Sequence, residues 1–405
     1  MNENKKGTAL KATIVVCLSL LFVLSLAEVA IRIVEKSGAY PEVFKLIGNA
    51  SPPLNRRDGP GMYYAHQYSA YALKPGYSVG DRERINSLGF RGEEIALEKP
   101  EGVFRIVAIG GSTTFAVYLP WHQSFPYYLQ KELRSRFNTD RIEVINAGLT
   151  GSTAAESFHR MATQVLPVDP DMVIIYHGFN DLLPRVFDDY QEDYYHFRKS
   201  DPNNPPGMSR FYIYRLALRV LSPGLFHENN NLMRHVWKTQ NLPDTDTERA
   251  RNFLASSSDA FRENMEDMVA LLKGRGVKVV LASFAILPDT WHWMDAIPPY
   301  LWELGIKENN EVVAELASKY DVPEVPFAEA PFKDGAAYYK TKMFDDSIHM
   351  SPAGNQFKAA IFADTVAPIM AKALGVKVPA MSAFHSIDGA KSVDRATETA
   401  TDNDL

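Results

Sequence analysis

The sequence predicts an α/β fold, a three-layer sandwich in which helices cover both faces of a five-stranded, mostly parallel sheet. From Phe104 onward, short apolar runs alternate with amphipathic stretches of ten or more residues. This alternation is typical of parallel strands joined by crossover helices. On such sheets ligands bind beyond the carboxyl ends of the strands, so the loops after strands are the first place to look for chemistry.

Five apolar runs are the expected strands. They are residues 104–109, 142–145, 172–176, 277–284 and 322–325.

Helix signals lie between these runs. Pro126 stands in the first turn of a helix that opens near Ser124, and Ser351 with Pro352 opens the last helix. Thr153 and Glu156 form a capping box. The residues expected to face inward from that helix are Phe158, Met161, Ala162 and Val165. A further helix carries Phe261, Met265, Met268, Val269 and Leu272 and is expected to stop at Gly274, and another is centred on residues 308–320.

Composition excludes several classes of function. The 405-residue chain has a net charge of −6 and no run of basic residues interleaved with aromatics, so no nucleic-acid partner is expected. Its one cysteine, Cys17, can form no internal disulfide. The ten histidines form no His-Glu-x-x-His or His-x-His cluster, and we expect neither a metal nor a cofactor.

The N-terminus carries a candidate membrane span. Residues 12–31 contain one charge, Glu28, and as a helix they would extend about 30 Å, the thickness of a hydrocarbon core. Lys5, Lys6 and Lys11 precede the span, which favours a cytoplasmic N-terminus and a domain on the far side of the membrane, such as the periplasm.

A cleaved signal peptide is the alternative, because Ser25-Leu26-Ala27 offers small residues near a cleavage site at Ala27. The apolar pattern continues to Val34, which favours the anchor.

We expect four parts along the chain. They are an anchor at 1–34, a linker and N-terminal extension at 35–100, a catalytic domain at 101–377 with an insertion at 183–256, and a disordered tail at 378–405.

Polar residues follow the first three strands. Gly110-Gly111-Ser112 comes after the first, Asn146-Ala147-Gly148 after the second and Gly178-Phe179-Asn180 after the third. Each segment by itself fits an ordinary turn. Together they place a serine hydroxyl, a backbone N–H and an amide at one edge of the sheet.

A serine nucleophile needs a base and a group that orients the base. Asp346-Ser347-Ile348-His349, just before the helix at Ser351, supplies a carboxylate three residues before a histidine. By itself this pattern also fits a surface turn.

With these blocks in this order, the chain resembles the SGNH family, also called GDSL hydrolases, over residues 104–375. The resemblance implies a flavodoxin-like sheet of order 2-1-3-4-5. It also implies Ser112 as nucleophile, His349 and Asp346 as base and orienting acid, and an oxyanion hole formed by Ser112, Gly148 and Asn180. Where many members have Gly-Asp-Ser, this chain has Gly110-Gly111-Ser112, which bears on substrate and rate. A lead-in at residues 86–92 also resembles exported members, and no catalytic role is assigned to it.

The expected function is that of a serine esterase or O-acyl transferase acting on an extracytoplasmic O-acylated glycan or lipid. Envelope or polysaccharide-assembly proteins are possible partners. Trp291 and Trp293 follow the fourth strand, and their rings suit the apolar faces of a sugar. A non-catalytic glycan-binding module on the same fold is the competing hypothesis.

Overall fold

The computed structural model describes residues 3–40, 61–66, 69–198, 211–221, 237–238, 241–287, 297–332 and 342–378. The chain divides into two compact units: residues 1–67 with 199–237, and residues 68–198 with 238–405. The predicted insertion at 183–256 is therefore shared between them. Apart from Val378, the predicted tail lies outside the described residues.

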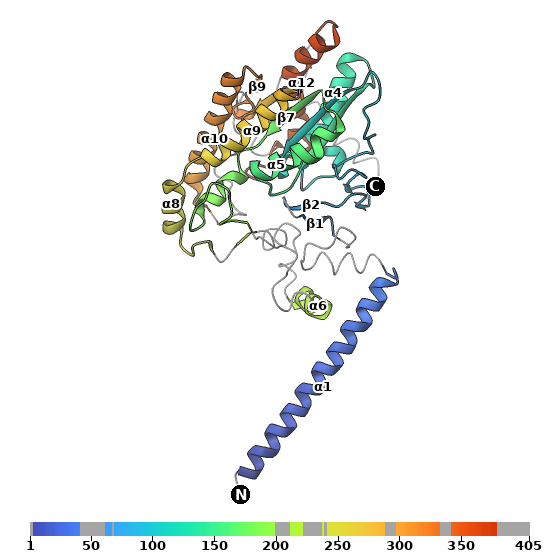
Figure 1. The fold of residues 1–405 in the computed structure, drawn as a ribbon, viewed down its shortest axis with the longest axis vertical. Helices are drawn as coiled ribbons and strands as arrows, with labels where there is room; N and C mark the ends of the chain where they lie inside the picture. The colour runs from blue at the N-terminus through green and yellow to red at the C-terminus, as the bar shows by residue number, and fades with distance from the viewer. Residues whose placement is uncertain are drawn as a thin grey trace. The chain divides into compact units, whose positions relative to one another are not determined.

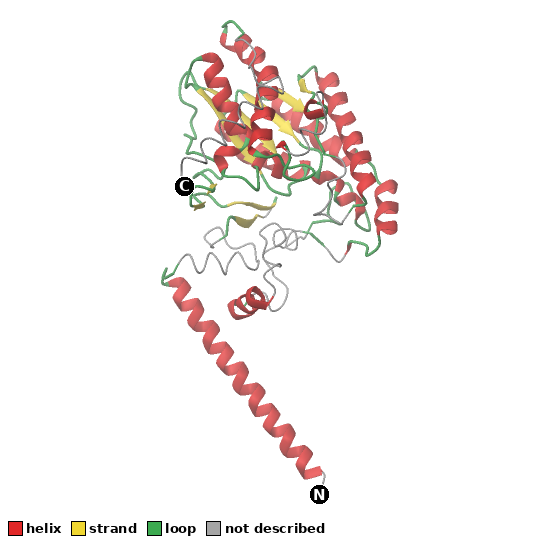
Figure 2. Ribbon diagram, turned by 180° about the vertical axis from the view of Figure 1, so that it is seen from behind, coloured by secondary structure: helices red, strands yellow, loops and turns green. Residues whose placement is uncertain are grey.

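The larger unit is built on a parallel sheet of five strands in the order β6-β5-β7-β8-β9. Their bounds are Phe104–Gly110 for β5, Ile142–Gly148 for β6, Met172–Tyr176 for β7, Lys278–Ala282 for β8 and Glu324–Val325 for β9. Numbered along the chain, this order is 2-1-3-4-5, and the predicted fold is confirmed. Figure 2 shows the strands enclosed between helices.

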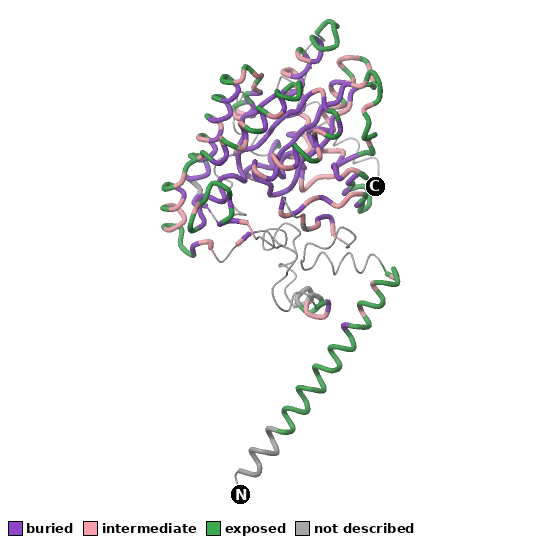
Figure 3. The backbone as a smooth tube through the Cα atoms, viewed as in Figure 1, coloured by how far each residue is buried: buried purple, intermediate pink, exposed green. Residues whose placement is uncertain are grey.

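Helices cover both faces of the sheet (Figure 1). On one face, inward residues of β5, β6, β7 and β8 form a single apolar cluster with α5 (Ala154–Arg160), α9 (Asp259–Gly274) and α10 (Pro299–Tyr320). On the other, α4 (Phe125–Phe137) packs against α12 (Pro352–Leu374), and the rings of Phe125, Tyr176 and Phe362 meet between them. The strands are buried from both sides (Figure 3).

The remaining helices and strands of this unit are short. They are α3 (Ser112–Phe115), α8 (Asp246–Ala255), β2 (Ala70–Leu73), β3 (Ser78–Val79) and β4 (Glu83–Arg84).

Two features differ from the sequence prediction, and the first affects the site. β6 runs three residues further than expected, to Gly148, because β5 continues to Gly110 and the parallel register pairs these two glycines. After α5 the chain makes one turn of π-helix, Met161–Val165, which changes the phase of the inward face. Ala162 is therefore exposed, although it was predicted to face inward.

The other helix signals hold. Ser351 caps α12 by accepting from the N–H of Gly354 at 3.2 Å, and the five predicted apolar residues of α9 are buried. Gly274 is the last residue of α9.

The smaller unit contains α1 (Glu3–Lys36), α6 (Tyr212–Leu221) and β1 (Tyr63–His66). Within the described residues one helix, Lys11–Lys36, is long and apolar enough to cross a membrane. Its apolar side chains are exposed, as the tube in Figure 3 shows along α1.

Candidate active site

Ser112 stands at the first position of α3, immediately beyond the carboxyl end of β5. The turn from strand to helix leaves no room for a side chain on Gly110, and a side chain on Gly111 would displace the end of Asn180. A Cβ on Gly110 would lie 2.2 Å from Thr114 Oγ1 and 2.5 Å from the carbonyl oxygen of Tyr176, and a Cβ on Gly111 would lie 2.6 Å from Asn180 Nδ2. The departure from Gly-Asp-Ser thus leaves space that the Asn180 amide occupies.

His349 joins this serine to a carboxylate. Its Nε2 lies 2.7 Å from Ser112 Oγ, and its Nδ1 lies 2.7 Å from Asp346 Oδ2. The ring of Tyr118 contacts the imidazole edge-on, with centroids 4.9 Å apart. A serine hydroxyl, an imidazole and a carboxylate in this sequence form the arrangement that activates a serine for attack.

The Asp346 carboxylate is held in its ionised form. Burial would raise its pKa, but the hydrogen bond and charge of His349 and the N–H groups of Ile348 and His349 outweigh burial and lower the pKa below its usual value. Those two N–H groups donate to Oδ1 at 2.8 and 2.7 Å. With Oδ1 occupied by the backbone, Oδ2 is directed at the imidazole.

Asn180 lies beside the serine turn. It opens a short 3₁₀ helix after β7, and its Nδ2 donates to the carbonyl of Ser152 at 2.8 Å. One N–H of that amide is therefore used within the protein, which leaves the second for a ligand.

The predicted role of Gly148 needs correction. Its N–H donates to Asn146 Oδ1 at 2.9 Å, and a Cβ there would lie 2.3 Å from the backbone nitrogen of Phe115. Gly148 is the last residue of β6 and packs against α3, so its N–H is not free for a substrate. The sequence prediction ended this strand at residue 145 and therefore placed Gly148 in the following loop.

Gly151 is a residue that sequence reasoning missed. It lies in the turn that does follow β6, with φ of +76°, and directly precedes the Ser152 carbonyl that Asn180 contacts. Among the described residues its carbonyl accepts from Arg198, whereas its N–H has no partner. The sequence offered one signal for this residue, because Gly151 is a second glycine three positions after Gly148.

The lead-in at residues 86–92 supports α3, the helix that begins with Ser112. The Arg91 guanidinium lies 3.9 Å from the centroid of the Phe115 ring and donates to the carbonyl of Leu119 at 2.6 Å. Its backbone N–H donates to Asn146, whose Nδ2 in turn donates to the Thr114 carbonyl at 2.9 Å. These contacts attach the lead-in to α3 and to the loop that follows α3.

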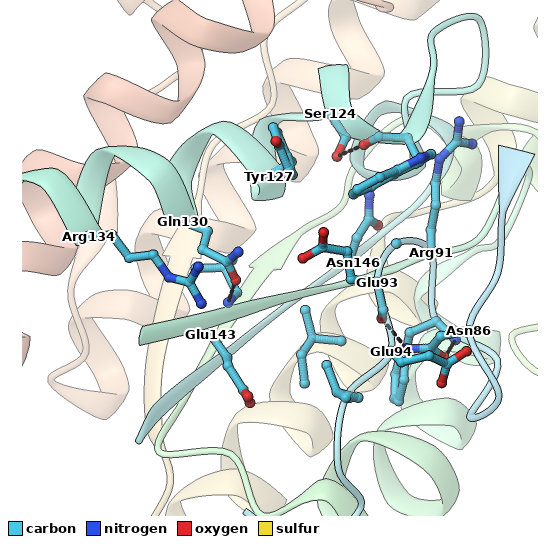
Figure 4. A pocket seen from close by; sticks show the side chains of 16 residues that line it. Asn86, Arg91, Glu93, Glu94, Ser124, Tyr127, Gln130, Arg134, Glu143 and Asn146 are labelled. Carbon is cyan, nitrogen blue, oxygen red and sulfur yellow. Dashed lines mark hydrogen bonds between the residues drawn. The ribbon is translucent and has the colours of Figure 1, made fainter. Parts of the chain in front are cut away.

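A small cleft beside Ser112 is lined by Ser112, Asn180, Phe179, Phe284 and Ile348 among others. A second cleft, of about 100 Å³, lies between the lead-in, α4 and β6 (Figure 4) and shares no lining residue with the first.

Two polar side chains of the second cleft are bonded to β6. Gln130 accepts from the Val144 N–H and Arg134 donates to the Ile142 carbonyl, which closes the free edge of β6. Trp291 and Trp293, predicted to contact substrate, lie outside the described residues.

The sequence model of the GDSL-like lipase/acylhydrolase family matches residues 108–357, which is more than half of the chain. The chain belongs to this family. The resemblance to SGNH/GDSL hydrolases is thereby confirmed, and a comparison with curated proteins found no match.

Several solved structures are similar to this family member. The lipase/acylhydrolase from Enterococcus faecalis is 18% identical, with 65% of this chain and 95% of that chain covered and a TM-score of 0.36. A GDSL-like lipase from Bacteroides thetaiotaomicron is 15% identical, with 66% and 88% covered and a TM-score of 0.35. An acetyl xylan esterase from Geobacillus stearothermophilus is 15% identical, with 65% and 94% covered and a TM-score of 0.39.

Asp181, the residue after Asn180, carries a buried carboxyl group. Asp181 Oδ1 accepts from the Ala154 N–H at 2.9 Å and from the Tyr194 hydroxyl at 3.2 Å, and so ties β7 to the start of α5. Burial raises the pKa of Asp181 from 3.8 to about 7.

This pKa shift predicts a pH-dependent stability. When the pKa of a carboxyl is higher in the folded than in the unfolded chain, its contribution to the free energy of unfolding is fully present below about pH 4. This contribution falls by roughly 1.4 kcal/mol per pH unit as the pH rises toward 7. Asp181→Asn cannot ionise, so its melting temperature should change less between pH 4.5 and 7.5 than that of the unsubstituted protein. Equal changes in the two proteins would show that Asp181 is ionised throughout this range.

Proposed function

We propose that this GDSL-family protein is a serine esterase or O-acyl transferase that acts through an acyl-Ser112 intermediate on an O-acylated glycan or lipid outside the cytoplasm. The observation that supports this most directly is the chain of two 2.7 Å contacts from Asp346 through His349 to Ser112.

In the proposed reaction, Ser112 Oγ attacks the ester carbonyl while His349 Nε2 takes the hydroxyl proton. The imidazolium that forms is stabilised by the Asp346 carboxylate, which the lowered pKa keeps ionised at neutral pH. As the tetrahedral intermediate collapses, the carbon–oxygen bond to the alcohol breaks and His349 returns the proton to that alcohol. Water or a second hydroxyl, deprotonated by His349, then attacks the acyl-serine. As the bond between the acyl carbon and Ser112 Oγ breaks, His349 returns the proton to Oγ.

Three donors are proposed for the oxyanion. The N–H of Ser112 lies in the first turn of α3, where helix N–H groups have no intrahelical acceptor. Asn180 contributes its second amide N–H, and Gly151 contributes the backbone N–H that the sequence analysis attributed to Gly148. Fixed donors of this kind stabilise charge that develops in the transition state.

The lining of the cleft at Ser112 favours a short acyl group. The apolar side chains of Phe179, Phe284 and Ile348 surround it and leave little free space beside Ser112. The alcohol portion would then extend from the opening. Contact of Trp291 and Trp293 with a sugar remains part of the proposal.

The exposed apolar surface of α1 supports membrane attachment, with the N-terminus cytoplasmic and the catalytic unit on the opposite side. Cleavage near Ala27 is the alternative.

The first test concerns the nucleophile. A serine-directed fluorophosphonate should label Ser112, and Ser112→Ala should abolish labelling and lower esterase activity by about 10⁴-fold or more. Ser157 is a matched control, because its Oγ also lies 2.8 Å from a histidine, His177, whose pKa burial lowers to about 4. Ser157→Ala should keep its label. An unlabelled but folded chain would favour the glycan-binding module.

A second test concerns Asn180. If its amide donates to the oxyanion, Asn180→Ala should lower kcat by about 10²–10³ with little change in KM. Asn309→Ala is the control, because it removes a buried amide that donates to the Gly178 carbonyl at 2.7 Å. It should lower the melting temperature and leave kcat of the folded protein nearly intact. A kcat unchanged by Asn180→Ala would remove that residue from the site.

The third test concerns attachment. The full chain should sediment with membranes, whereas a chain lacking residues 1–34 should be soluble and keep its activity toward a small ester. A soluble product of the full gene that begins near residue 28 would instead identify a cleaved signal peptide.

A further inference from the structure

The single acidic residue of the apolar N-terminal stretch is bonded in the structure. Glu28 is only 7% exposed on a helix whose other described residues are mostly exposed. Arg32 donates to it through Nε at 2.9 Å, and Nη2 lies 2.8 Å from the same carboxylate. The backbone N–H of Ile213, in the first turn of α6, donates to its other oxygen at 3.1 Å. A carboxylate at the edge of a hydrocarbon core needs such partners, because leaving it unpaired there is costly.

Contacts between the two helices continue from this carboxylate toward the end of α1. Tyr212 is buried and packs against Ile31, and the Arg32 guanidinium lies 5.6 Å from the centroid of its ring. The Tyr212 hydroxyl donates to Glu35. The contacts therefore cover residues 28–35 of α1, about 10 Å along the helix axis. If residues 12–31 cross the hydrocarbon core, this segment lies where the chain leaves it.

Apolar residues of α6, and the residue directly before it, remain exposed beside these contacts. Leu216 is 42% exposed, and Phe211, directly before the helix, is 41% exposed. Ala217 is exposed as well. An amphipathic helix of this kind lies in the plane of a membrane interface, with its apolar side about 5–10 Å deep among headgroups and acyl chains.

We propose that α6 is an interfacial helix that rests in the outer layer of the same bilayer that α1 crosses, with Phe211 and Leu216 in contact with lipid. This inference depends on the proposed membrane attachment. It assigns a membrane-binding role to part of the insertion at 183–256, and the Glu28–Ile213 bond couples this helix to the span.

The test uses the full chain with Cys17→Ser, so that a single new cysteine can carry a polarity-sensitive fluorophore. The labelled positions are Leu216→Cys on α6, Leu24→Cys on α1 and, as a matched control, Leu254→Cys, an exposed leucine of α8. Each protein is reconstituted into phosphatidylcholine vesicles that contain lipids with a nitroxide either at the headgroup or midway along an acyl chain. Retained hydrolysis of a small ester shows that each labelled protein is folded.

At position 216 the headgroup nitroxide should quench more strongly than the mid-chain nitroxide. The reverse order is expected at position 24, and neither lipid should quench at position 254. Quenching at 24 without quenching at 216 would overturn the interfacial placement of α6 while the anchor stands, as would equal quenching at 216 and 254. A lack of quenching at 24 would overturn the membrane anchor and this inference together, and would leave the proposed chemistry at Ser112 unaffected.

Discussion

The close approach of backbone to backbone at the carboxyl ends of β5 and β6 is the constraint on which the catalytic unit depends. Gly110 has no space for a side chain because Thr114 and the Tyr176 carbonyl fill the position of a Cβ, and Gly148 has none because α3 lies against it. These two glycines are paired in register across the sheet. Because these glycines lack side chains, the four-residue helix that begins with Ser112 packs directly against the edge of the sheet. Asn180 and His349 lie next to the start of that helix.

Buried carboxyl groups around the site illustrate two ways in which a protein accommodates acids in a dry interior. Glu156 is buried, yet the charge and hydrogen bonds of Arg198 lower its pKa against the effect of burial. Asp346 is held ionised by His349 and two backbone N–H groups. Asp181 has no ion pair with a described residue, and burial raises its pKa instead. Glu156 and Asp346, which face Arg198 and His349, are thus favoured in the ionised form. Asp181, which links β7 to α5 through hydrogen bonds, is favoured in the neutral form.

The lead-in at residues 86–92 shows how a segment without reactive groups can matter to a reaction. Arg91 is buried, stacks on Phe115 and donates to the loop that follows α3. Asn146 receives the backbone N–H of Arg91 and holds the Thr114 carbonyl. A shift of this segment would be transmitted to Ser112, the proposed nucleophile, through two hydrogen bonds, and a displacement of about 1 Å can reduce a rate by about 10²-fold.

Local patterns in the sequence predicted the strands, most helix limits and the residue types proposed for the site, because strand and helix periodicity, glycine turns and caps depend on near neighbours. The strand order followed from the resemblance to the SGNH family. Ser112, Asp346 and His349 could be chosen for the same reason, since each directly follows a strand or precedes a helix cap. The tertiary structure decided what depends on distant pairing. It extended β6 to Gly148 by register with β5 and so left Gly151 as the free amide, and it placed Asn180 in the space above Gly111. It also gave Glu28 a partner in Ile213, 185 residues away along the chain. No local pattern encodes such contacts, because they arise only when separate elements pack together.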